Sequence, residues 1–298
     1  MRALLLLWRF GRPHTLIGTT LSVLGVYVLV ADDVAEVGDR PGDLLCTLLA
    51  ALAVNVFITG INQLEDVEID RINKPHLPIA AGELSPRAGR WIVAASAVLP
   101  VALALTQGLV ELAAVLAGLL VGVAYSVPPL RLKRWPALAA ISISGVRALV
   151  VNLGVAMHFG LTLADTTHIP AGVWVLTVFV APFSVAIALL KDVPDIEGDR
   201  RYRIATYSVR LGGTVVLRAG LALLGAAYLG IAVAAPFLLD GWAAAFLAAT
   251  HVLALGVLLA AARRTDPADR AVFTGFYMFV WRLFFLEYVV VPLAWLIA

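Results

Sequence analysis

The sequence predicts an all-helical protein that crosses a membrane nine times. Hydrophobic residues make up 61% of the 298 residues and charged residues only 14%, and the mean hydropathy is +0.94. Soluble domains usually carry about 25% charged residues. The apolar residues also fall in long runs, and the basic residues gather in the loops between them. Together these observations indicate a polytopic membrane protein.

Each expected span is an apolar run long enough to cross a bilayer, which takes roughly 20 residues. Gly118 and Gly122 in the fourth run have the spacing that lets two membrane helices pack closely. We expect an interfacial helix within residues 1–15 and a single membrane domain over residues 1–298. The nine spans are predicted at 14–31, 42–65, 88–106, 109–127, 136–159, 170–191, 212–236, 240–262 and 272–297.

The distribution of basic residues predicts the orientation. Of the 22 Lys and Arg residues, 19 lie in the N-terminal segment or around the loops after spans 2, 4, 6 and 8. We therefore expect a multi-pass protein of a prokaryotic-type cell membrane, with a cytoplasmic N-terminus and an external C-terminus. A net charge of +2, sorted in this way, does not point to nucleic acid. The opposite side carries Arg40 and mostly acidic residues, namely Asp32, Asp33, Glu36, Asp39, Asp43, Asp165 and Asp240.

An acidic stretch, NQLEDVEIDRINKPHLP at 62–78, closes the second apolar run. Asn62, Asp66 and Asp70 are four residues apart, which stacks them on one helical face. Stacked carboxylates repel each other at a membrane edge unless a cation binds to them. Oxygen ligands of this kind suit Mg²⁺. The alternative for this stretch alone is a solvated acidic loop.

A second acidic stretch, KDVPDIEGDR at 191–200, closes the sixth run. Asp192, Asp195 and Asp199 again share one helical face. Both acidic faces are expected on the same side of the membrane, so we predict two Mg²⁺ ions that hold one diphosphate between them. Lys191 and Arg200 flank this row and are candidate ligands of the substrate.

Further cations are expected near the two rows. Pro128 and Pro129 end the fourth span, after which Arg131 and Lys133 lie at the level of the acidic faces. They are candidates for binding the departing diphosphate, with Tyr125 beside it. The alternative for this pair is the ordinary positive charge of a cytoplasmic loop.

Several polar residues fall inside spans. Arg147 is expected to face the cavity and pair with a carboxylate of the protein or of an acidic substrate, with Asn152 nearby. The alternative is a structural ion pair. Arg282 and Glu287 are each expected to bond a neighbouring span. The aromatic residues of the ninth span fit packing or an interfacial belt, or else the lining of an isoprenoid channel.

Other chemistries are not supported by the sequence. Cys46 is the single cysteine, so neither an internal disulfide nor a thiolate metal site is possible. No two of the five histidines have metal-ligand spacing. A transporter would place ionisable residues near mid-membrane in several spans, whereas nearly all of them lie at one face. No obligate protein partner is indicated.

With these motifs in place, the sequence resembles the UbiA superfamily of intramembrane aromatic prenyltransferases. The family signatures N-x-x-x-D-x-x-x-D and D-x-x-x-D match Asn62, Asp66, Asp70 and Asp195, Asp199. Within the superfamily it is most similar to homogentisate prenyltransferases, through RPHTLIGT at 12–19, residues 62–85, AYSVPPLRLKR at 124–134 and residues 191–200. Asp192 is also typical of that group.

The resemblance implies a Mg²⁺-dependent transfer of a prenyl group from its diphosphate to a phenolic ring, in a cavity open to the cytoplasm and to lipid. It implies metal binding by both acidic rows, diphosphate binding by Lys133 and Arg131, and orientation of an acceptor carboxylate by Arg147 or Arg12. Homogentisate, with loss of its carboxylate, is the expected acceptor.

Other acceptors remain open within this resemblance. They are 4-hydroxybenzoate, a naphthoate and a chlorophyllide, and a membrane terpene cyclase with the same aspartate clamp is a further alternative. Arg203 and Ala205 depart from the glycine and the basic residue that the resemblance implies near those positions.

Overall fold

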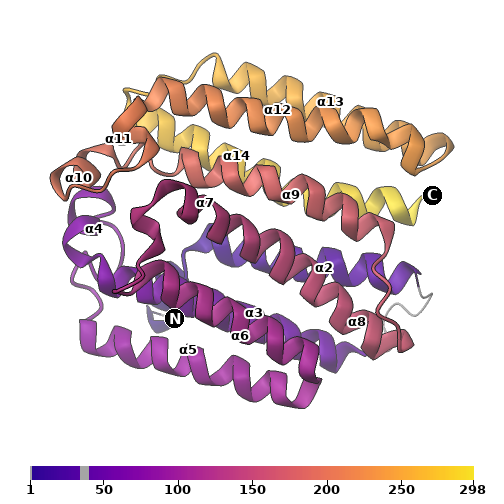
Figure 1. The fold of residues 1–298 in the computed structure, drawn as a ribbon, viewed down its shortest axis with the longest axis horizontal. Coiled ribbons are helices and arrows are strands. Elements are labelled where there is room, and N and C mark those ends of the chain that lie inside the picture. The colour runs from indigo at the N-terminus through magenta and orange to yellow at the C-terminus, as the bar shows by residue number, and fades with distance from the viewer. Residues whose placement is uncertain (1, 34–39) are drawn as a thin grey trace.

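The computed structural model describes residues 2–33 and 40–298, whose regular structure is entirely helical (Figure 1). Nine helical segments of this described part are long and apolar enough to cross a membrane, as predicted. Glu36 and Asp39, which the charge pattern assigns to the external side, lie outside the described residues. The nine segments are α2 (Pro13–Asp33), α3 (Pro41–Glu65), α5 (Pro86–Gln107), α6 (Leu109–Ser126), Pro136–Ala164, α9 (Ala171–Leu190), α12 (Gly213–Leu238), α13 (Gly241–Ala262) and α14 (Arg270–Leu296).

The fifth span has an unusual helical geometry. It consists of α7 (Pro136–Ser144), nine residues of π-helix (Gly145–Leu153) and α8 (Gly154–Ala164). A π-helical stretch inside an α-helix often marks a functional site. Here it carries Arg147 and Asn152, the two polar residues that the sequence places inside this span.

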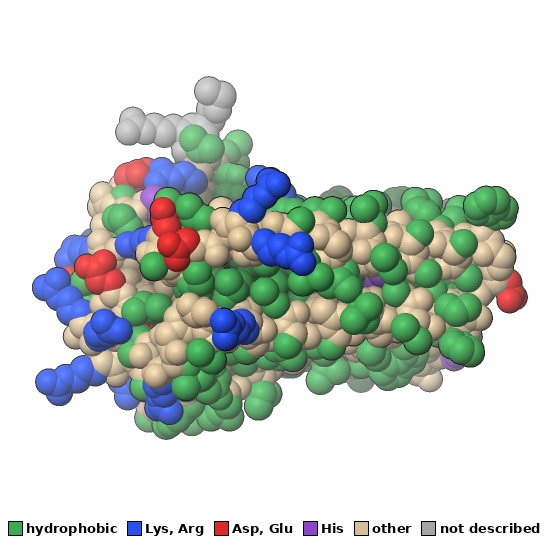
Figure 2. Space-filling model, turned by 90° about the horizontal axis from the view of Figure 1, so that it is seen from above, with side chains coloured by type: hydrophobic (Ala, Val, Ile, Leu, Met, Phe, Trp, Pro, Cys, Tyr) green, Lys and Arg blue, Asp and Glu red, His purple; other side chains and the backbone are tan. Residues whose placement is uncertain are grey.

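Short helices gather at one end of the molecule. They are α1 (Arg2–Phe10), α4 (Val67–Asn73), α10 (Ile196–Arg201) and α11 (Tyr207–Leu211). Figure 1 shows α4, α10 and α11 together at the left edge, and Figure 2 shows most charged side chains of the visible face at this same end. We call it the Asp-rich end, because the loops after spans 2 and 6 lie there.

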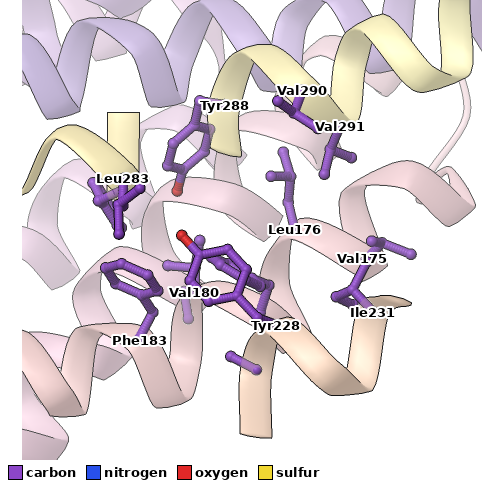
Figure 3. Packing of buried hydrophobic residues seen from close by; sticks show 14 of the residues in the cluster. Val175, Leu176, Val180, Phe183, Tyr228, Ile231, Leu283, Tyr288, Val290 and Val291 are labelled. Atoms are coloured by element: carbon purple, nitrogen blue, oxygen red, sulfur yellow. The ribbon is translucent and has the colours of Figure 1, made fainter. Parts of the chain in front are cut away.

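The largest buried cluster surrounds α9, which is the most buried of the nine spans. Phe183 of α9, Tyr228 of α12 and Tyr288 of α14 point into the space between these helices (Figure 3). Burial of such aromatic side chains stabilises helix packing through close contact. The end of α9 at Leu190 is therefore held firmly, and the second acidic row begins directly after it.

A second group of helices forms around α3. A Cβ atom on Gly118 of α6 would lie 2.9 Å from Val54 Cγ1, and one on Gly122 would lie 2.8 Å from Ile58 Cγ1. The two glycines therefore let α6 approach α3 closely, as predicted. This contact fixes the end of α3, where the first acidic row begins.

The two charged residues of the ninth span behave differently. Glu287 Oε1 lies 3.0 Å from His251 Nε2 of α13, so the expected bond to a neighbouring span is confirmed. Arg282 is exposed and makes no hydrogen bond or ion pair within the described residues.

Candidate active site

The first acidic row lies where α3 passes into α4. α3 ends at Glu65 and α4 begins at Val67, so Asp66 joins the two helices. The Asp66 N–H donates to the Asn62 carbonyl at 3.1 Å, and the Asp70 N–H donates to the Asp66 carbonyl at 2.8 Å. The one-turn spacing expected from the sequence therefore continues across the junction.

Asp66 is surrounded by donors from two other segments. Arg131 Nη2 donates to Oδ1 at 2.9 Å, and Lys133 Nζ donates to Oδ2 at 2.6 Å. Asn62 Nδ2 also donates to Oδ2, at 3.1 Å, and Arg12 Nη2 donates to Asn62 Oδ1 at 3.3 Å. The predicted proximity of the Arg131–Lys133 pair to the first row is confirmed.

Three arginines at this end occupy the left-handed region of backbone space, which non-glycine residues rarely adopt. They are Arg12 (φ 58°), Arg131 (φ 41°) and Arg203 (φ 57°). Such strain persists only where the surrounding structure enforces it. At position 203 it also gives a physical reason for the glycine that the resemblance implies there, because glycine adopts positive φ at no steric cost.

The second acidic row spans the loop after α9 and the start of α10. Asp192 Oδ1 accepts a hydrogen bond from Lys191 Nζ at 2.7 Å. Asp195 forms an ion pair with Lys74, a residue of the first acidic stretch. Asp199 Oδ2 accepts a hydrogen bond from Thr206 Oγ1 at 3.3 Å. Each aspartate of this row thus has a partner that holds its side chain in place.

Asn73 joins the two rows directly. Its Nδ2 donates to Asp199 Oδ1 at 3.2 Å, and its Oδ1 accepts from the Gly198 N–H at 3.0 Å. Arg270, at the start of α14, donates to the Asn73 carbonyl. The two acidic stretches lie more than 120 residues apart in the chain, yet the side chain of Asn73, which belongs to the first stretch, bonds two residues of the second.

Both rows line one cavity of ≈ 1220 Å³ that extends into the helical bundle. Lys133, Tyr125 and Lys191 line it at the Asp-rich end, and Arg147 lines it further inside. The deeper walls carry many apolar side chains of α3, α6 and the fifth span, whereas α2 contributes Thr15, Thr19 and Ser22. A large apolar cavity with a few converging charged groups is the usual form of a ligand site.

Arg147 faces this cavity, as expected, but it stacks on an aromatic ring. Its guanidinium carbon lies 4.5 Å from the centroid of Trp281 and 5.7 Å from that of Phe284. Nη1 has no hydrogen-bond partner within the described residues. A half-buried cation with one unused donor, held over a π face, is suited to binding an anion that enters the cavity.

Three predicted substrate ligands lie outside the lining of this cavity, namely Arg131, Asn152 and Arg200. Arg131 donates to Asp66, which does line it. Asn152 is fully buried and accepts a hydrogen bond from Tyr288 OH at 2.8 Å, which ties the fifth span to α14. Arg200 is exposed. Asn152 therefore joins two helices, and Arg200 faces away from the space in which a substrate would bind.

Burial alters the acidity of the carboxyl groups at this end. It raises the pKa of Asp199 to about 7, with the neighbouring Asp192 and Asp195 adding to the effect. Burial likewise raises the pKa of Asp70, and it lowers the pKa of Lys133. These shifts mean that the site, without further cations, holds its negative charges at a free-energy cost.

The donor set fits a hard divalent cation. Asp70 is 4% exposed, and its Oδ2 has no hydrogen-bond partner in the described part of the chain. Among the described residues, no three Asp, Glu, His or Cys side chains gather around one point. Asp66 pairs with Arg131 and Lys133, and Asp195 pairs with Lys74. Mg²⁺ commonly uses one or two carboxylates, with water and substrate phosphate completing its shell.

Comparison with known proteins identifies the fold. A sequence model described as the UbiA prenyltransferase family matches residues 15–283. The chain belongs to the UbiA prenyltransferase family. A solved UbiA homologue from Archaeoglobus fulgidus, bound to GPP and Mg²⁺, has a TM-score of 0.67 at 18% identity and covers 96% of this chain and 99% of its own. A UbiA homologue from Aeropyrum pernix K1 has a TM-score of 0.68.

Two relatives within the UbiA family are similar along nearly the whole chain. The homogentisate phytyltransferase of Synechocystis sp. is 45% identical over 97% of this chain and 95% of its own length. The homogentisate geranylgeranyltransferase of Triticum aestivum is 36% identical over 96% of this chain and 71% of its own length.

Sequence reasoning missed several residues of this UbiA site. Asn73, Lys74 and Gly198 lie inside the acidic stretches, but their role as contacts between the rows depends on the tertiary fold. The sequence places Trp281 only within an aromatic-rich span. It shows Arg270 only as a basic loop residue, although this arginine reaches the Asn73 carbonyl.

Proposed function

We propose that this protein transfers a phytyl or geranylgeranyl group from its diphosphate to homogentisate. The observation that carries the proposal is the 45% identity, over 97% of the chain, to the homogentisate phytyltransferase of Synechocystis sp.. The cavity supports it, because charged groups at one end and apolar walls beyond them match a prenyl diphosphate. The sorting of basic residues further supports a cytoplasmic position for the Asp-rich end.

The donor diphosphate binds at the Asp-rich end in this proposal. The acidic rows would hold two Mg²⁺ ions, whose charge would make the diphosphate a better leaving group. Lys133, Arg131 and Lys191 supply positive charge to the diphosphate oxygens. The rows that hold the metal are Asn62, Asp66, Asp70 and Asp192, Asp195, Asp199.

The acceptor binds deeper, next to Arg147. The guanidinium pairs with the carboxylate of homogentisate, and Arg12 lies near the first row as a second cation. Tyr125 lines the cavity between the acidic rows and Arg147. This arrangement places an electron-rich ring next to the reacting carbon of the donor, away from bulk water.

The reaction balances without an oxidant. The bond between the prenyl carbon and the diphosphate oxygen breaks, and a bond from that carbon to the ring forms. The carboxylate leaves as CO₂, and its former CH₂ carbon takes up a proton to become a methyl group. The ring loses one proton at the prenylated position, so the proton count is unchanged.

A product assay tests this proposal. The purified protein, with Mg²⁺ and geranylgeranyl or phytyl diphosphate, should convert homogentisate to a decarboxylated prenyl quinol detectable by mass spectrometry. EDTA should abolish the product, and added Mg²⁺ should restore it. Product from 4-hydroxybenzoate but none from homogentisate would overturn the choice of acceptor, and full activity in EDTA would overturn the metal requirement.

We expect the Arg147→Gln variant to bind the acceptor poorly. Loss of a charge-assisted hydrogen bond is worth about 1.5–3 kcal/mol, so the KM for homogentisate should rise about 10- to 100-fold. The KM for geranylgeranyl diphosphate should change little, because its diphosphate binds elsewhere. Steady-state kinetics with each substrate varied in turn measure both values.

The matched control for this substitution is Arg282→Gln, which removes an exposed arginine of α14 and should leave both constants unchanged. A rise in the donor KM alone would show that Arg147 serves the diphosphate instead.

A further inference from the structure

The proton that the acceptor ring loses needs a base, and one imidazole in the cavity is available to take it. His14 lines the cavity and is half-buried. Its ring makes no hydrogen bond or ion pair within the described residues. A neutral imidazole whose nitrogens have no partner is the side chain most often used to accept a proton in a reaction.

His14 lies between the two places where the substrates bind in the proposed function. Arg12, two residues before it, donates to Asn62 of the first acidic row at 3.3 Å. The ring centroid of His14 lies 4.8 Å from that of Trp281, with an angle of 65° between the two ring planes. The guanidinium carbon of Arg147 lies 4.5 Å from the same Trp281 ring. The imidazole is therefore close both to the first row and to the arginine that binds the acceptor.

The first turn of α2 holds this imidazole in place. The Thr15 N–H donates to the Arg12 carbonyl at 2.8 Å, and Thr15 Oγ1 donates to Asn55 Oδ1 of α3 at 3.1 Å. A Cβ atom on Gly18 of α2 would lie 3.2 Å from the Trp281 side chain, so α2 approaches α14 closely at this level. A base must lie within hydrogen-bond distance of the proton that it takes, and contacts on two sides give the position that this requires.

The charged groups around His14 leave its ring free to accept a proton. Arg12 and Arg147 are the cations that act on it, and His76 is the other titratable side chain that does so. Tyr277 of α14 lines the same cavity. None of these four is a carboxylate, so none of them holds a proton on the ring before the acceptor reacts. His76 is exposed and also lines the cavity, which gives the proton a route to solvent.

We propose that His14 is the base that removes the ring proton of the acceptor. This inference rests on the proposed function, because it takes the acceptor carboxylate to be bound by Arg147. Once the prenyl carbon has bonded to the ring, that ring carbon still carries its hydrogen. A nitrogen of His14 takes this proton, and the electron pair of the C–H bond returns to the ring. The ring becomes aromatic again, the proton leaves to water, and no oxidant is needed.

Ring-deuterated homogentisate tests this step in the full-length protein with Mg²⁺ and geranylgeranyl diphosphate. In the unmodified protein the labelled and unlabelled acceptors should react with the same kcat, because we expect cleavage of the donor to limit the rate. The His14→Gln variant keeps a polar side chain but has no base, so its kcat should fall about 10²-fold. The labelled acceptor should then react more slowly than the unlabelled one, because proton loss has become the slow step. A purely structural role of His14 would lower kcat without creating an isotope effect.

The matched control is His168→Gln, which removes an exposed histidine outside the cavity lining and should change neither kcat nor the isotope effect. Thermal stabilisation by Mg²⁺ with the donor should stay the same in every variant, which reports an intact donor site. If His14→Gln loses this stabilisation, His14→Ala with added imidazole decides, because the smaller side chain leaves room for a free base. Recovery of transfer with imidazole would support the proposal, and no recovery would overturn it.

Unmodified kcat in His14→Gln would overturn the proposal, as would a lower kcat without an isotope effect. The departing diphosphate or a water molecule would then be the group that takes the proton. The choice of acceptor is tested separately. If 4-hydroxybenzoate gives product and homogentisate does not, the same comparison uses ring-deuterated 4-hydroxybenzoate, because its ring also loses a proton on prenylation.

Discussion

The Asp66→Asn variant should fold and insert normally but lose prenyl transfer by about 10²–10³-fold, the range expected when one preorganised electrostatic contact is removed. Asp66 is the carboxylate on which Arg131, Lys133 and Asn62 converge. Asparagine has nearly the same shape but no charge. It would leave two cations unpaired and would weaken the attraction for a divalent ion.

Three measurements separate this effect from misfolding. Size-exclusion chromatography in detergent reports folding, a labelled geranylgeranyl donor reports transfer, and thermal stabilisation by Mg²⁺ with diphosphate reports binding. The matched control is Glu68→Gln, because Glu68 lies two residues after Asp66, is exposed and, among the residues that the structure describes, pairs only with Arg71. Transfer by Asp66→Asn within about tenfold of the unmodified protein would contradict a role for the first row.

The Gly198→Ala variant should lose nearly as much activity without changing any charge. A Cβ atom at position 198 would collide with Asn73 Oδ1. Asn73 must then move, which breaks its hydrogen bonds to the Gly198 N–H and to Asp199 and separates the two acidic rows. We expect a lower apparent affinity for Mg²⁺ and a much lower kcat, measured by titrating Mg²⁺ at saturating donor.

A double variant tests whether the effect of Gly198→Ala is caused by the displacement of Asn73. Asn73→Ala removes the colliding atom, so adding Gly198→Ala to it should have little further effect, and the two substitutions should be strongly non-additive. Gly256→Ala serves as the control, because a Cβ atom there meets no other atom within 4 Å. Additive losses in the double variant would show that Gly198 acts independently of Asn73.

Local sequence patterns were sufficient to predict the membrane spans and most residues of the two acidic rows. Each span is a long apolar run, and the one-turn spacing of Asn62, Asp66 and Asp70 depends only on helix geometry. The spacing persists even though the helix is interrupted at Asp66, because the hydrogen bonds continue through the junction. Such short-range features can be read from residues close together in the chain.

The contacts between distant segments could not be predicted from local sequence patterns. The bonds from Asn73 to Asp199 and from Lys74 to Asp195 join residues more than 120 positions apart. No local pattern distinguishes Asn73 from any other helix-terminal asparagine. The π-helical stretch around Arg147 could not be predicted from the sequence either, because it depends on packing rather than on helix propensity. The sequence predicts that Arg147 pairs with a carboxylate of the protein or of an acidic substrate. Among the described residues no carboxylate pairs with Arg147, whose guanidinium lies over Trp281, and its pairing with a substrate stays a prediction.

The bond from Arg270 to Asn73 bears on biogenesis. Ribosomes deliver the N-terminal spans first, so the segment with Asn62 and Asp70 is made long before the helix that begins at Arg270. A nascent chain still missing its last span has both acidic rows but lacks one of the supports that hold them together. The protein should therefore become able to cleave an isoprenoid diphosphate only when its synthesis is almost finished. Incompletely synthesised chains should then not consume the prenyl diphosphate.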